Sequence, residues 1–235
     1  MDTKYIYSSN RVKAMEHTLL TDSQIDRLLS AKGYSQAFVS LNDTFLSPYI
    51  STEDKTNLPK ALRESLIDTK KEISFISQDP KLLDILWLRY DFHNLKTIIK
   101  GTRAGLSEDE IISKCYGIGS IEVDNLYKVF RSEHFETLES GLGYAYENSK
   151  NLSESYEIDI VMHKAYFRTI KRIADISQDL FLHRLVSMLI DLFNIKTSLR
   201  ILSMPNINGQ LFIRGGNLRE ENMRSEESIF TALNG

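Results

Sequence analysis

Apolar side chains recur every three or four positions along most of this chain, which is the spacing of an amphipathic helix. Residues 154–176 are one example, with Tyr156, Ile160, Phe167 and Ile170 close to the helical period. Convincing alternation of apolar and polar positions, which marks a half-buried strand, is not found in the sequence. The pattern therefore predicts an all-α fold.

Capping signals predict where the helices begin and end. Thr21 and Gln24 form a capping box before an apolar stripe, and Gly33 is placed to end that helix. Ser107 and Glu110 form a second capping box before a short helix. Capping signals and apolar spacing together predict the other helices, over residues 57–76, 79–101, 107–115, 154–176 and 180–202.

The sequence repeats itself at a distance of 100 residues. Residues 76–79 and residues 176–179 both read Ile-Ser-Gln-Asp. Over residues 69–100 the shift gives twelve identities in 32 positions. Composition alone would give roughly two, so duplication is the better explanation. A glycine turn follows each copy, at residues 117–121 and 214–218, so each repeat is a helix pair, a connector and a turn that leads into another helix.

The repeat divides the chain into three predicted segments. Residues 1–55 form an N-terminal helical segment that packs on the first repeat, residues 56–135 form the first repeat, and residues 136–235 form the second.

An Asp-x-x-Asn pair occurs in both repeats, as Asp91 with Asn94 and as Asp191 with Asn194. On a helix of 3.6 residues per turn, each pair lies on the same side as apolar neighbours. A buried carboxylate or amide without partners costs about 1–3 kcal/mol. Two interpretations stay open: a polar clamp that binds backbone amides of a neighbouring turn, or a metal or acid–base site. We favour the clamp, because no second Asp, Glu or His recurs at ligand spacing beside the pair.

Basic residues recur on the opposite side of the same helices, as Lys96 and Lys100 in the first repeat and Lys196 and Arg200 in the second. Cations in the last turn of a helix complement its dipole, and this accounts for Lys100 and Arg200. The alternative is a surface that binds an acidic partner.

Signatures of catalysis are absent from the sequence, which has no phosphate loop of the Walker type and no HExxH, CxxC or GxSxG motif. Gly215 and Gly216 could cradle a phosphate, but a sharp turn between helices is the simpler interpretation. We therefore predict no catalytic residue, no cofactor and no metal ion.

Composition and charge narrow the setting of the protein. The net charge is −3, from 29 basic and 32 acidic residues, so we expect no nucleic-acid partner. The single Cys115 excludes an internal disulfide framework and favours a reducing, cytoplasmic location. Residues 180–202 are the most apolar stretch, but they carry too many charged residues for a membrane span.

Four motifs occur in order along nearly the whole chain. They are Tyr5-x-Tyr7-x-x-Asn10-Arg11-Val12-Lys13, Leu19-Leu20, Leu88-Arg89-Tyr90-Asp91-Phe92-His93-Asn94-Leu95-Lys96 and Phe212-Ile213-Arg214-Gly215-Gly216. Together they resemble the C-type central-stalk component of the archaeal and bacterial V/A-type ATPases, whose eukaryotic counterpart is the d-type component of the V-type ATPase.

The resemblance implies a non-catalytic helical socket, shaped like a funnel and built from pseudo-threefold repeats. In that family the socket sits on the cytoplasmic end of the membrane-embedded proteolipid ring and receives the foot of the central rotor shaft. It couples ATP hydrolysis to proton or sodium movement, and it associates with the membrane peripherally, through its protein partners. Two alternatives stay open: a helical adaptor or scaffold outside the pump, and a helical metal-dependent hydrolase.

This chain departs from the family pattern in one respect. The two Asp-x-x-Asn helices match two of the family's three repeats, and the third is missing from this sequence. Two repeats would leave apolar edges open, which predicts either self-association or a concave trough. The residues expected at these edges are Tyr5, Tyr7 and Val12 near the start, and Met223, Ile229 and Phe230 near the end.

Overall fold

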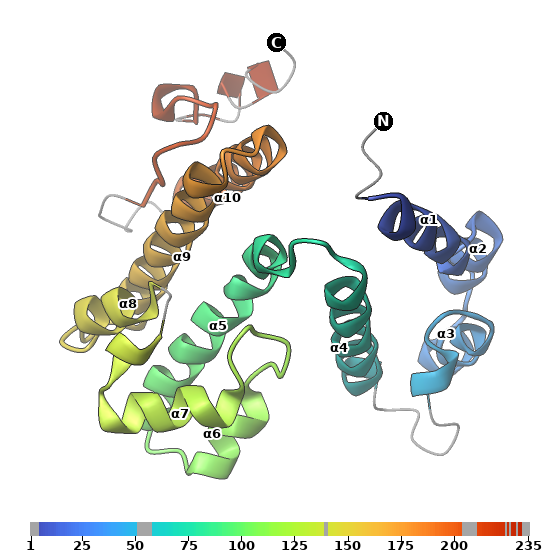
Figure 1. Cartoon of the computed structure of the whole chain (residues 1–235), viewed down its shortest axis with the longest axis horizontal. Coiled ribbons are helices and arrows are strands. Elements are labelled where there is room, and N and C mark those ends of the chain that lie inside the picture. Colours follow the sequence, from blue (N-terminus) through green and yellow to red (C-terminus); the bar gives the residue numbers. More distant parts are fainter. Residues whose placement is uncertain are drawn as a thin grey trace. The chain divides into compact units, whose positions relative to one another are not determined.

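The computed structural model describes residues 5–50, 58–138, 141–203, 211–223, 225, 227–228 and 230–231 of the chain. Within these ranges the regular structure is entirely helical, which confirms the predicted all-α fold (Figure 1). The α-helices are α1 (Ile6–Met15), α2 (Asp22–Leu29), α3 (Tyr34–Ser40), α4 (Leu58–Ile76), α5 (Pro80–Arg103), α6 (Glu108–Lys114), α7 (Val123–Ser132), α8 (Leu142–Ser149), α9 (Ser155–Ser177) and α10 (Leu180–Ser203).

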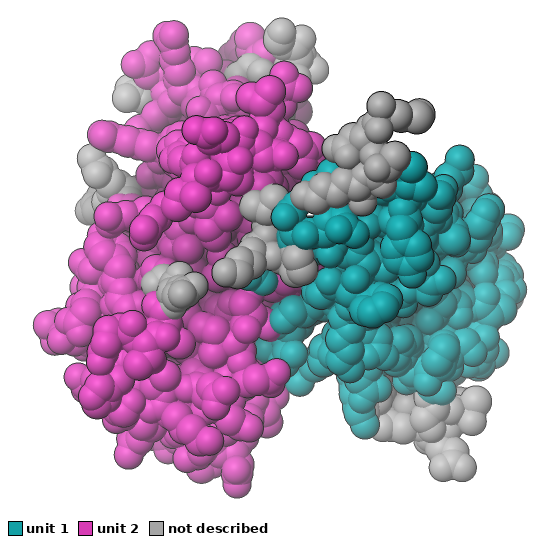
Figure 2. All heavy atoms as spheres, viewed as in Figure 1, with its two compact units in different colours: residues 1–84, 116–118 teal, residues 85–115, 119–235 magenta. Residues whose placement is uncertain are grey.

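The chain forms two compact units (Figure 2). The first comprises residues 1–84 and 116–118, and the second comprises residues 85–115 and 119–235. The boundaries predicted from the repeat, after residues 55 and 135, lie inside these units, so they stay a prediction about duplicated segments. In the part of the chain that the structure describes, no helix has both the length and the apolar character needed to cross a membrane.

In the first compact unit, α1 is held against the end of α4 by polar contacts. Ser8 donates a hydrogen bond to the carbonyl oxygen of Ile76, and Arg11 forms an ion pair with Glu72. The hydroxyl of Tyr5 donates to Asp79 Oδ2 at 3.1 Å. These contacts place α1 on the first of the two Ile-Ser-Gln-Asp corners.

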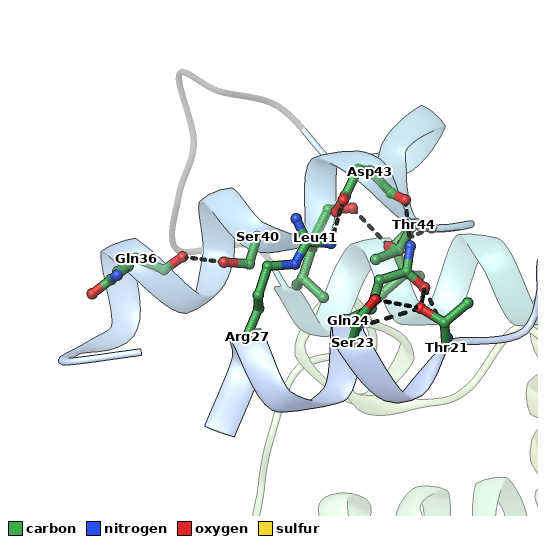
Figure 3. Close-up of polar contacts among 10 residues, drawn as sticks. Thr21, Ser23, Gln24, Arg27, Gln36, Ser40, Leu41, Asp43 and Thr44 are labelled. Carbon is green, nitrogen blue, oxygen red and sulfur yellow. Dashed lines mark hydrogen bonds and ion pairs between the residues drawn. The ribbon is translucent and has the colours of Figure 1, made fainter. Parts of the chain in front are cut away.

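Helix α2 begins where the sequence predicts and ends earlier. The capping box is present, with Gln24 N 3.3 Å from Thr21 Oγ1 and Thr21 N 2.9 Å from Gln24 Oε1 (Figure 3). The prediction that Gly33 ends this helix is wrong, because α2 stops at Leu29 and Gly33 precedes α3. A second apolar stripe, which buries Phe38, starts just after Gly33 and requires a new helix direction.

The second compact unit has a continuous apolar core. Residues of α5, α6, α7, α8 and α9 contribute to it, and Leu95, Ile98 and Leu126 are fully buried there. Helices α9 and α10 form a hairpin joined by Gln178 and Asp179, where Gln178 adopts a left-handed φ of 54°. Four predicted helices, over residues 57–76, 79–101, 154–176 and 180–202, appear as α4, α5, α9 and α10 within two residues of their expected ends.

Candidate functional site

The first Asp-x-x-Asn helix is clamped to the turn that precedes α7. Asp91 on α5 is fully buried. Its Oδ2 accepts a hydrogen bond from the backbone N–H of Ser120 at 2.9 Å, and its Oδ1 accepts one from Ile121 at 3.1 Å. A carboxylate that receives two backbone donors in this way holds the entry to α7 in one place.

The second helix makes the same clamp with the turn after α10. Asp191 accepts from the backbone N–H groups of Asn217 and Leu218, each at 2.9 Å, and from Asn217 Nδ2 at 3.0 Å. The clamped turns lie 97 residues apart while the aspartates lie 100 apart, so a length difference of three residues is absorbed in the connectors.

A glycine stands beside the carboxylate in each turn. A Cβ atom added to Gly119 would overlap Oδ1 of Asp91 and lie 3.0 Å from its Cγ, and one added to Gly216 would overlap Oδ1 of Asp191 and lie 2.9 Å from its Cγ. Real Cβ atoms essentially never approach an oxygen so closely, so each clamp needs a residue without a side chain at this position. Gly215 adopts a left-handed φ of 112°, which also favours glycine.

The asparagines lie one turn further along the same helices. Asn194 pairs with the backbone of Ile213 through two hydrogen bonds of 2.8 Å, one donated by Asn194 Nδ2 and one accepted by its Oδ1. Asn94 occupies the equivalent place and is fully buried. In the second repeat, the aspartate and the asparagine thus bind two points of the same connecting segment.

This geometry favours the clamp over a metal or acid–base site. Both carboxylates accept from backbone amides, and no group of three or more His, Cys, Asp or Glu that could hold a metal ion occurs among the described residues. The turn at Gly215 and Gly216 does not favour phosphate binding either. The backbone donors that follow it already bind the carboxylate of Asp191.

The basic residues behave differently in the two repeats. Lys96 and Lys100 are partly buried and share Asp159 of α9, at 3.4 Å and 2.6 Å. The interpretation of Lys100 as a partner of the helix dipole alone is therefore incomplete, since its close partner is a carboxylate. Lys196 and Arg200 are exposed at the equivalent places on α10.

Sequence reasoning missed Asp159. Its position inside a helical apolar stripe was visible, but its partners lie 59 and 63 residues earlier in the chain. The rules that pair charges at short helical spacing cannot find such contacts.

The expected apolar edges are found in part. Tyr5, Tyr7 and Val12 are exposed on or beside α1, and Phe230 is exposed near the other end. The expectation for Met223 is wrong, because this side chain is buried and its carbonyl oxygen accepts a hydrogen bond from Ser198 of α10. Ile229 lies outside the described residues.

Two histidines beside the lysine pair predict that acid destabilises the fold. Burial is the main cause that lowers the pKa of His93 and of His163, and the positive charge of Lys96 lowers both further. Arg89 also lowers the pKa of His93, and Arg200 that of His163, while Asp159 opposes both shifts. The unfolded chain therefore binds protons at a pH where the folded chain does not.

We expect full stability above about pH 6.5, with stability falling as the pH drops through the lowered pKa values of the two folded-state histidines. The measurement is urea unfolding at about pH 7.5 and about pH 5.5. His163→Gln should reduce the difference between the two, and His17→Gln, at an exposed site, should leave it unchanged. Equal stability of the unmodified chain at both pH values would contradict the expectation.

The fold and the clamps define an all-helical repeat protein whose repeated polar groups hold its own turns. Residues 9–229 match the family described as the ATP synthase (C/AC39) subunit. The chain belongs to this family.

Curated relatives agree with the family match, and all three described here are C-type subunits of ATP synthases. The chain is 28% identical over 250 residues to that of the A-type enzyme of Pyrococcus horikoshii, covering 98% of this chain and 67% of the relative. It is 25% identical over 239 residues to that of the V-type enzyme of Deinococcus radiodurans, covering 93% of this chain and 66% of the relative. It is 24% identical over 214 residues to that of the A-type enzyme of Methanocaldococcus jannaschii, covering 83% of this chain and 54% of the relative. The chain thus spans about two thirds or less of the length of these relatives.

Proposed function

We propose that this protein is a non-catalytic part of a V/A-type rotary ATPase that links the central rotor shaft to the proteolipid ring of the membrane. It would lie on the cytoplasmic face and associate with the membrane peripherally, through its protein partners. The observation that carries the proposal is the family match over residues 9–229, which leaves little of the chain outside it.

The clamps give physical support to a coupling role. A part that passes torque between two partners must keep its shape under load. In both repeats a buried carboxylate ties a long helix to a turn that is distant in sequence. Each tie adds charge-assisted hydrogen bonds in a place with little access to water, where they resist deformation.

The proposal assigns no chemistry to the chain itself. The relatives are named as subunits of ATP synthases, and ATP hydrolysis coupled to proton or sodium transport would belong to the complex as a whole. The repeated polar residues contribute by holding helices and turns in place.

Reconstitution tests the proposal directly. The purified chain is mixed with the rotor-shaft proteins of the same organism, with the detergent-solubilised proteolipid ring, or with both, and each mixture is examined by sedimentation velocity. We expect co-sedimentation with each partner and a ternary complex when both are present. Sedimentation of the chain alone in all three mixtures would contradict the coupling role and would favour a helical adaptor outside the pump.

A further inference from the structure

Helices α5 and α10 carry equivalent rows of side chains, and only the row on α5 is covered. The row on α5 is Phe92, Lys96 and Lys100, and a shift of 100 residues turns it into Leu192, Lys196 and Arg200. Phe92 is 3% exposed, whereas Leu192 is 49% exposed. Since the positions are related by the repeat, what covers the first row indicates what the second row can bind.

The row on α5 is covered by α9. The ring of Tyr166 meets the ring of Phe92 edge to face, with the ring centres 5.9 Å apart. Asp159, two turns earlier on α9, binds Lys100 at 2.6 Å and Lys96 at 3.4 Å. An apolar residue and a carboxylate two turns apart on one helix are therefore matched to an apolar residue and two cations on the other.

Apolar neighbours of the two rows differ in the same way. Leu88 and Ile99 of α5 are 6% and 3% exposed, while Met188 and Leu199 of α10 are 56% and 41% exposed. We call the surface made by Met188, Leu192, Lys196, Leu199 and Arg200 the α10 face. A continuous apolar stripe of this kind, flanked by two cations, is typical of a surface that binds a partner.

We propose that the α10 face binds an amphipathic helix of another polypeptide, which carries a carboxylate in the position that Asp159 has on α9. The apolar side of that helix would cover Met188, Leu192 and Leu199. Its carboxylate would lie between Lys196 and Arg200, as Asp159 lies between Lys96 and Lys100.

A second copy of this chain fits the α10 face less well. The repeat counterpart of α9 is α4, which presents Leu62 and Leu66 on its exposed surface. However, Pro59 stands at the position equivalent to Asp159, and Lys60 follows it. Docking α4 of another copy would thus bring a further cation toward Lys196 and Arg200. Charge complementarity favours a partner helix that has the acid.

Apolar burial and charge would contribute differently to binding. Covering the leucines and the methionine supplies most of the affinity, because exposed ion pairs contribute little. The cations set the register and exclude helices without the acid, because like charges brought together weaken a complex. A charge reversal on either side should therefore weaken binding, and reversal on both sides should restore it.

The test uses the full chain and a fluorescent peptide with the sequence of residues 155–177 as the probe, followed by fluorescence anisotropy. We expect saturable binding to the unmodified chain. The double variant Lys196→Glu/Arg200→Glu should bind the peptide about ten-fold more weakly or worse. A peptide with Asp159→Lys should bind the unmodified chain with a similar loss and should recover most of its affinity for the double variant.

The matched control reverses two exposed cations of α7, in Lys128→Glu/Arg131→Glu, and should leave peptide binding unchanged. Four results would overturn the proposal: no saturable binding up to about 1 mM peptide, which is the limit of weak association; equal losses in the control and the α10 variant; no recovery in the charge-swapped pair; or dimerisation of the unmodified chain that Leu192→Glu abolishes. Because neither shaft nor ring is used, failure here leaves the rotor-coupling role untouched.

Discussion

Asp91→Ala should lower the free energy of unfolding by about 2–5 kcal/mol. The substitution removes a fully buried carboxylate and leaves the backbone N–H groups of Ser120 and Ile121 without the acceptor that holds them. It also leaves a small cavity beside Gly119. Urea unfolding followed by circular dichroism measures the loss, and the purified variant should remain helical below its transition.

Two further variants separate the clamp from a general effect of core mutation. Asp91→Asn keeps the shape of the side chain and one acceptor oxygen, so its loss should be smaller than that of the alanine variant. Asp191→Ala should also cost less, because Asn217 is exposed and water can replace part of the lost bonding. If Asp91→Ala were as stable as the unmodified chain, the clamp would have no energetic role.

Gly119→Ala should be as damaging as loss of the aspartate. The added methyl group would fall inside van der Waals contact of Asp91 Oδ1 and 3.0 Å from Cγ. The obstacle is a buried carboxylate that already binds the turn on both oxygens, so it cannot swing away without breaking those bonds. We expect a loss of about 2–4 kcal/mol, in the range of strained or overpacked core sites.

Gly117→Ala is the matched control, two residues earlier in the same turn. A Cβ there meets only Ile67 Cδ1, at 3.8 Å, which is an ordinary contact. Its φ is not in the left-handed region, so alanine can adopt the same backbone. We expect a change within about 0.5 kcal/mol. Equal losses at positions 117 and 119 would show that the turn resists any substitution and would contradict the close approach to Asp91 as the cause.

Helices and duplication could be predicted from the sequence because both depend on short-range patterns. The apolar period and the capping boxes at Thr21 and Ser107 act within one or two turns, and the structure shows both boxes. The burial of Asp91 and Asn94 followed from their place on the apolar side of a helix, since a helical period determines which residues share a side. The need of a buried carboxylate for donors then predicted a clamp.

Other features depended on tertiary contacts. The pairing of Asp159 with Lys96 and Lys100, the burial of Met223 and the end of α2 before Gly33 each involve segments that no local pattern connects. The sequence shows two equivalent helices with equivalent cations, and it treats the two alike. Only the tertiary structure distinguishes them, because α9 covers the row on α5 while Leu192 of the α10 row stays exposed. The physical reason is that side-chain pattern determines which face of a helix is apolar, whereas the path of the rest of the chain determines whether that face is covered.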